Sequence, residues 1–151
     1  MIRPSTAFLT IALFSLSSGC SRPPPDEVKT IKTPQADVHL TYEYWNLGPL
    51  VSDSARLVAH LVKDGIEDRQ IVIDGDYIDI RKISWPRPDR MVVCVTYLDQ
   101  VSEWNKSVML KAGNLSKTIH VELRAAAQRD NNRKNFDPPP PNNCPIVASS
   151  T

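Results

Sequence analysis

The prolines of this chain are concentrated at its two ends, and this limits the segment that can fold compactly. Ten of the 13 prolines among the 151 residues lie outside residues 38–126. Proline lacks the amide hydrogen that helices and sheets require, so a compact fold tolerates few prolines. All three tryptophans and all four tyrosines fall inside 38–126. We therefore expect one small domain, residues 38–126, between two proline-rich ends.

Residues 1–19 have the composition of a signal peptide. Arg3 precedes an apolar stretch over residues 7–16, and small residues follow up to Cys20. The stretch spans about ten residues, which is too short for a membrane-spanning helix of about 20. Residues 16–20, Leu-Ser-Ser-Gly-Cys, resemble the lipobox of bacterial lipoproteins, in which the peptide is cut before a cysteine that carries the lipid. The resemblance implies a lipid on Cys20, and an ordinary secretory signal is the alternative.

The residue after this cysteine bears on the location of the protein. In the lipoprotein family an aspartate at that position favours the inner membrane, whereas this chain has Ser21. The resemblance therefore implies the outer membrane of a two-membrane bacterium, with the domain facing the periplasm. A secreted or free periplasmic protein is the alternative. Residues 20–37 contain four prolines, and we expect an extended tether that holds the domain up to about 50 Å from the membrane.

The C-terminal segment 127–151 is rich in proline and asparagine. Residues 128–135 are polar throughout, and residues 138–141 are four consecutive prolines. Such a composition buries too little apolar area to offset the entropy of ordering, so we expect a mostly disordered tail. A proline-rich ligand for a binding module is the alternative interpretation.

The clearest helix pattern lies at residues 55–64. Leu57, Val58, Leu61 and Val62 recur at helical spacing, residues 52–54 (Ser-Asp-Ser) offer N-cap side chains, and Gly65 is placed to end a helix. We therefore expect one helix here.

Strand patterns occupy most of the remaining domain. Residues 38–45 and 118–124 alternate between apolar and polar side chains, and residues 91–97 are almost continuously apolar. Residues 74–76 (Asp-Gly-Asp) lie between β-branched runs and predict a hairpin turn. Residues 98–112 are ambiguous, and we favour a strand over 106–111. Together these patterns predict an α+β domain, a mostly antiparallel sheet of five or six strands with one packed helix.

Two cysteines remain if Cys20 is lipidated. Export to an oxidising compartment would allow Cys94 and Cys144 to form a disulfide. That bond would close a loop of about 50 residues, contribute about 4 kcal/mol in the chain-entropy model, and pin the tail to the sheet. Two free thiols, one buried in a strand and one in the tail, are the alternative.

Residues 85–90, Trp-Pro-Arg-Pro-Asp-Arg, form the best candidate for a recognition surface. Trp85, Arg87 and Arg90 are residue types enriched at binding hot spots, and two prolines stiffen the segment. In the alternative interpretation Trp85 covers the edge of the core and the two arginines are merely solvated.

We find no sequence pattern that indicates catalysis, a metal or a cofactor. A net charge of +1 argues against nucleic-acid binding. No Gly-x-Ser-x-Gly, HExxH or glycine-rich phosphate loop is present. His39 and His120 could share a sheet face with Glu43 and Glu122 and hold a metal, although solvent-facing side chains are the simpler interpretation. His60 has apolar neighbours and is interpreted as a boundary residue of the helix.

These observations predict a lipid-anchored envelope protein that is not an enzyme and acts by binding another protein. Suitable settings are a secretion or conjugation apparatus, envelope assembly, or immunity against an exported toxin. The main alternative is a small periplasmic metal-binding or hydrolytic domain using His39, His120 and nearby carboxylates. A third hypothesis, binding of cell-wall glycans, requires exposed Trp and Tyr side chains on the sheet.

Overall fold

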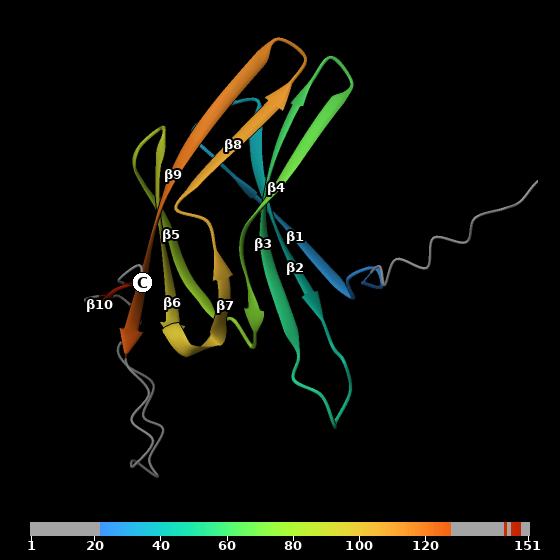
Figure 1. The fold of residues 1–151 in the computed structure, drawn as a ribbon, viewed down its shortest axis with the longest axis vertical. Coiled ribbons are helices and arrows are strands. Elements are labelled where there is room, and N and C mark those ends of the chain that lie inside the picture. The colour runs from blue at the N-terminus through green and yellow to red at the C-terminus, as the bar shows by residue number, and fades with distance from the viewer. Residues whose placement is uncertain (1–21, 128–143, 145, 149–151) are drawn as a thin grey trace, which may run out of the picture.

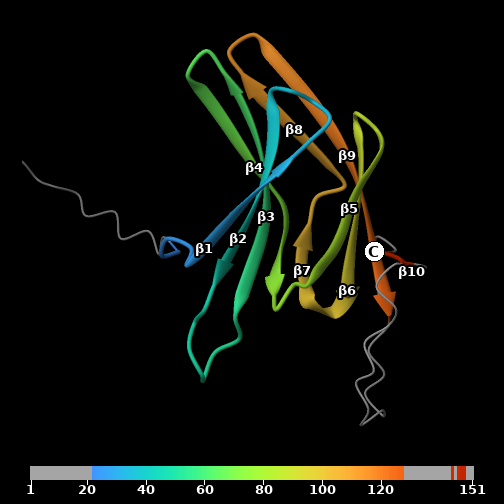
Figure 2. The same ribbon diagram turned by 180° about the vertical axis from the view of Figure 1, so that it is seen from behind.

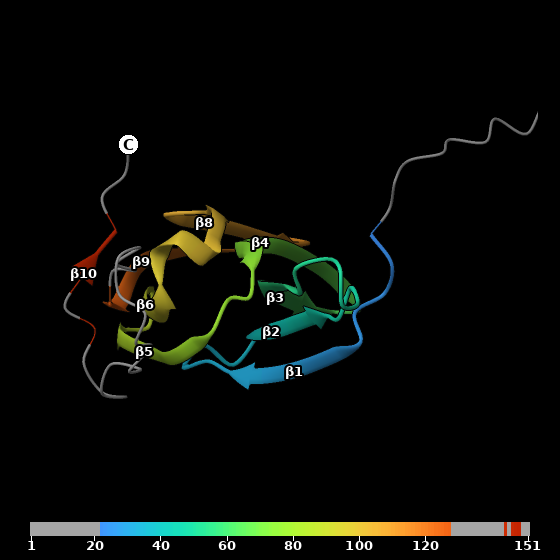
Figure 3. The same ribbon diagram turned by 90° about the horizontal axis from the view of Figure 1, so that it is seen from below.

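The computed structural model describes residues 22–127, 144 and 146–148, and this part of the chain is built from β-strands (Figure 1). Its only helical element is a single 3-10 turn, η1 (Leu98–Gln100), and no α-helix occurs among the described residues. Two sheets pack face to face, as the view along the layers shows (Figure 3). The predicted α+β fold with a packed helix is therefore wrong, and the domain is a β-sandwich.

Each sheet combines neighbouring hairpins with strands from distant parts of the chain (Figure 2). Sheet A has the order β1-β2-β3-β4-β7 and is antiparallel throughout. In sheet B the order is β10-β9-β6-β5, β8 also pairs with β9, and β6 and β9 are parallel. The strands are β1 (Glu27–Lys32), β2 (Val38–Trp45), β3 (Ser54–Lys63), β4 (Ile66–Asp76), β5 (Ile80–Arg87), β6 (Arg90–Tyr97), β7 (Val101–Trp104), β8 (Ser107–Ala112), β9 (Leu115–Ala127) and β10 (Ile146–Val147).

The segment expected to be a helix is strand β3. It lies between β2 and β4 and pairs with both along its length. As a central strand it is buried on both faces, with Leu57 and Leu61 inside the core and Val58 enclosed on the other side. Apolar residues on both faces remove the alternation that identifies a half-exposed strand, so the pattern resembled helical spacing.

Neither Asp-Gly pair has the role expected from the sequence, in which Gly65 was to end a helix and residues 74–76 were to form a hairpin turn. Asp64 and Gly65 form the turn between β3 and β4, where both have positive φ, 51° and 78°. This backbone is typical of a two-residue type I′ hairpin, which favours Asp-Gly. Gly75 lies within β4 at a register shift against β7, and a Cβ there would clash with the carbonyl oxygen of Gln100. Glycine is required at position 75 because the two backbones approach so closely.

Other strand predictions are confirmed, and the fold begins earlier than expected. Strand β2 has the expected bounds, and β8 and β9 meet at a turn formed by Gly113 and Asn114. Residues 27–32, assigned to the tether from the sequence, form edge strand β1 against β2. Its exposed side chains include Lys29 and Lys32, and charges of this kind protect an exposed edge from pairing with another chain.

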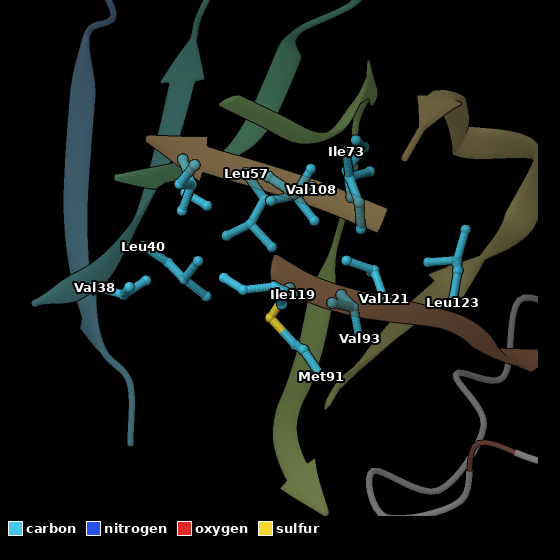
Figure 4. Close-up of a cluster of buried hydrophobic side chains, with 14 of the residues drawn as sticks. Val38, Leu40, Leu57, Ile73, Met91, Val93, Val108, Ile119, Val121 and Leu123 are labelled. Carbon is cyan, nitrogen blue, oxygen red and sulfur yellow. The ribbon is translucent and has the colours of Figure 1, made fainter. Parts of the chain in front are cut away.

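The core fills the space between the two sheets (Figure 4). Leu40 of sheet A points toward Ile119 of sheet B, and aliphatic side chains occupy most of the layer. The largest side chains that are fully enclosed are Leu40, Leu57, Leu61, Ile73, Met91, Leu110, Ile119 and Leu123. None of the helical segments among the described residues is long and apolar enough to cross a bilayer.

A disulfide joins Cys94 of β6 to Cys144, which is 50 residues further along the chain. It holds the C-terminal residues beside sheet B, where β10 pairs with Ala125 and Arg124 of β9. A short part of the tail therefore belongs to the fold.

Candidate functional site

A groove of about 390 Å³ opens beside β9. Strand β8 pairs with β9 as far as His120, and β10 begins opposite Ala125, so the neighbour of β9 changes between these points. The groove lies beside the part of β9 between the end of its pairing with β8 and the start of its pairing with β10. It is lined by Arg87, Arg90, Trp104, Lys106, His120, Val121, Glu122, Leu123 and Ala148.

The backbone of β9 at the groove already has hydrogen-bond partners. The amide of Val121 donates to the carbonyl oxygen of Lys106 at 2.8 Å, and the amide of Ala148 donates to that of Leu123 at 3.0 Å. An added strand would have to displace these bonds. We therefore expect a partner to be recognised by the side chains of the groove, and we do not expect it to bind by adding a strand to the sheet.

The lining of the groove is positively charged. Arg87, Arg90 and Lys106 contribute three cations against the single carboxylate of Glu122. The whole chain has a net charge of only +1, so the charge of the groove is a local feature. A mixed lining of this kind, with Trp104 and Ala148 as apolar walls, suits a ligand that carries both carboxylates and apolar groups.

Glu122 orients Arg90, one of the two arginines that line the groove. Its two carboxylate oxygens accept hydrogen bonds from Arg90 at 2.7 Å and Arg124 at 2.6 Å. These two bonds lower the pKa of the Glu122 carboxyl below its usual value, so it stays ionised into the acidic range. Arg90 is thereby held in one orientation. Arg87 contacts only Asp89 in the ion pairs of the described residues, at 3.7 Å with both side chains mostly exposed, and such a pair is weak.

The structure brings together two of the three residues proposed from the sequence for partner binding. Arg87 and Arg90 line the groove, whereas Trp85 packs against the core and is not among the described lining residues. The first part of the segment is strand and not loop, because β5 continues to Arg87 through a register shift that accommodates Pro86. Strand β5 is an edge strand, where proline is tolerated.

Trp104, Lys106 and Ala148 were not identified from the sequence. Their residue types carry no motif, and they come from two separate segments, 104–106 and the residues after β10, that only the sheet topology brings to β9. The pairing of Cys94 with Cys144 was the one sequence signal that could have placed the tail beside this strand.

The histidines are grouped differently from the sequence-based hypothesis. His39 is in sheet A and His120 is in sheet B, so the two do not form a common site. His39 instead stacks on His60, with ring centroids 4.7 Å apart and an interplanar angle of 6°. Burial, and secondly the neighbouring His60, lower the pKa of His39, while Glu67 acts in the opposite direction. Cys20, the proposed lipid attachment residue, lies outside the described residues.

Comparison with known proteins identifies no relative. No family model matches the chain, and neither curated proteins nor solved structures contain a significant match.

Proposed function

We propose that the protein is a lipid-anchored protein of the cell envelope whose β-sandwich is a non-catalytic module for binding another protein. The observation that carries the proposal is the groove at β9, where cations outnumber carboxylates beside the indole of Trp104. Tryptophan and arginine are the residue types most often found at binding hot spots. The partner is expected to supply an acidic segment with an apolar side chain next to the carboxylates.

The proposed location is the outer membrane, with the domain facing the periplasm. Residues 16–20 support this through their likeness to a lipobox, and Ser21 supports it through the sorting preference of lipoproteins. The disulfide between Cys94 and Cys144 fits an oxidising compartment such as the periplasm. Incorporation of labelled palmitate into the wild-type chain, and its loss in Cys20→Ser, is the expected result. Equal labelling of both proteins would contradict lipid attachment at Cys20.

Crosslinking from the groove in living cells tests the binding function. A photoreactive residue replaces Lys106 in one variant and Lys82, an exposed residue of β5 outside the groove, in the matched control. We expect Lys106 to give one envelope protein as the main product, identified by mass spectrometry. The control is expected to give much less of it.

A charge reversal then tests the chemistry. Arg87→Glu should reduce the crosslinked product because it places a carboxylate where the acidic segment binds, and raised salt should have the same effect. Arg87 is exposed, so this change should leave the unfolding midpoint nearly unchanged. Equal capture from positions 106 and 82, or capture that Arg87→Glu does not weaken, would show that the groove is not the binding surface.

A further inference from the structure

Three side chains with metal-ligand chemistry meet on the outer face of sheet A, and none of them lines the groove. His39, His60 and Glu67 each place one ligand atom within 4.8 Å of the other two. They come from three adjacent strands, β2, β3 and β4. The cluster therefore depends on the sheet and cannot be recognised as a sequence motif.

The strand register places these residues together. His39 and His60 are direct partners across the β2–β3 pair, so their side chains leave the sheet on the same face. The β4 partner of His60 is Arg69, and Glu67 lies two residues before it, on the same face of β4. The core lies on the other face, where Leu40 and Leu61 point.

His60 is held by hydrogen bonds at both ring nitrogens. Its Nδ1 lies 2.7 Å from Oε1 of Glu67, and its Nε2 lies 2.8 Å from Oγ1 of Thr41. The Thr41 hydroxyl can donate or accept, so it serves either tautomer of the imidazole. A metal ion on Nδ1 would leave Nε2–H to donate to Thr41, the arrangement that orients most metal-bound histidines.

We propose that His39, His60 and Glu67 bind one divalent cation of the kind that prefers imidazole ligands, with zinc as the reference ion. Two histidines and one carboxylate are an established donor set for zinc, and they leave a fourth position open to water or another ligand. Ligands about 2.0–2.1 Å from a tetrahedral zinc ion lie about 3.4 Å apart. Nδ1 of His60 and Oε1 of Glu67 are 2.7 Å apart and must separate, whereas the wider spacings of the cluster, which reach no further than 4.8 Å, must contract. The Glu67 side chain is 53% exposed and is free to make this adjustment.

The positively charged neighbours of the cluster do not prevent a cation from binding between His39, His60 and Glu67. Arg69, the β4 partner of His60, donates to Oε1 of Glu43 at 2.8 Å and is thereby engaged with another carboxylate. Lys32 of β1 is opposite His39 and is exposed, so its ammonium group can remain in water. The ion would replace the proton between His60 and Glu67 and would tie β2, β3 and β4 together at one end of sheet A.

Metal binding by the purified full chain tests the site. The protein is kept oxidised so that thiolates of Cys94 and Cys144 do not compete for the ion. Cobalt(II) is titrated first, because its visible absorption reports a tetrahedral site, and zinc is then used to displace it. His39→Gln and Glu67→Gln remove one ligand each, and His120→Gln is the matched control because His120 lies in sheet B.

We expect one zinc ion per wild-type chain, and the same for His120→Gln. His39→Gln and Glu67→Gln should weaken zinc binding by more than about tenfold, since changes to residues that merely support a ligand already reach this size. Circular dichroism of each variant checks that it is folded. The proposal is overturned if folded wild-type protein binds no zinc, or if His120→Gln weakens binding as much as Glu67→Gln does.

Discussion

The guanidinium carbon of Arg22 lies 4.4 Å from the ring centroid of Trp45, the last residue of β2. The same side chain reaches Asp74 at 3.2 Å and Ser54 at 2.6 Å, while the indole Nε1 of Trp45 donates to the carbonyl oxygen of Pro23 at 2.7 Å. The segment before β1 is therefore packed against sheet A. A lipid on Cys20 would then hold the domain close to the membrane, without the long spacer that the proline content predicted.

Arg22→Ala should lower the free energy of unfolding by about 1 kcal/mol. The change removes the nearer of the two guanidinium groups over the Trp45 ring and one of the two arginines that contact Asp74. Chemical denaturation of the full chain measures the effect. Lys29→Ala is the control, because the Lys29–Glu27 pair is mostly exposed and should contribute little. Equal effects of the two changes would show that the N-terminal segment is not docked.

Gly75→Ala should destabilise the domain by about 3 kcal/mol, since the new methyl group meets backbone rather than a flexible side chain. It would clash with the carbonyl oxygen of Gln100 and would force β7 away from β4. Differential scanning calorimetry of the purified protein measures the loss.

Gly65→Ala is the matched comparison. Gly65 also has an unfavourable backbone for alanine, with φ of 78°, but nothing lies within 4 Å of its added Cβ. The expected cost is about 1 kcal/mol, which is the strain of positive φ alone. A larger loss at Gly65 than at Gly75 would contradict the assignment of the hairpin turn and the close approach to these two glycines.

The sequence predicted a half-exposed strand well, and a central buried strand and the partnerships between distant segments poorly. The alternation over 38–45 identified β2 because one face of that strand is apolar and the other polar. The same reasoning failed for β3, which is central and buried on both faces. The Asp-Gly turn signal was assigned to the wrong pair, because Asp64 and Gly65 form the hairpin turn while Gly75 lies within β4, where it pairs with β7.

The same division applies to the candidate site residues. Arg87 and Arg90 stand close together in the sequence, and the composition around them was enough to propose them as candidates. The partners of His39 were not predictable, because His60 and Glu67 reach it only through the pairing of three strands. Local sequence patterns do not show which residues of neighbouring strands lie opposite one another.

Removal of the disulfide by Cys144→Ser should lower the free energy of unfolding by about 4 kcal/mol. The bond closes a loop with a sequence separation of 50 residues, and this value follows from the lost loop-closure entropy of the unfolded chain. Denaturation with and without reductant measures it in the wild type. In Cys144→Ser the free energy of unfolding should be the same with and without reductant, because no disulfide is present to be reduced. An unfolding midpoint that reductant leaves unchanged in the wild type would show that the bond is not formed.

Tyr44 should remain protonated well above the pH at which tyrosine normally ionises. Its hydroxyl donates to Oδ2 of Asp53 at 2.5 Å, and this bond to a carboxylate, aided by burial, raises the Tyr44 pKa from 10.0 to about 12. Because the folded-state pKa is the higher one, this interaction stabilises the fold fully below pH 10.0 and loses its contribution as the pH rises toward 12.

Ultraviolet titration of tyrosinate should show one group ionising near 12, and Asp53→Ala should move it toward 10. Burial also raises the pKa of Tyr42, so Tyr44→Phe is needed to assign the late transition. A late transition that persists in both variants would show that it does not belong to the Tyr44–Asp53 pair.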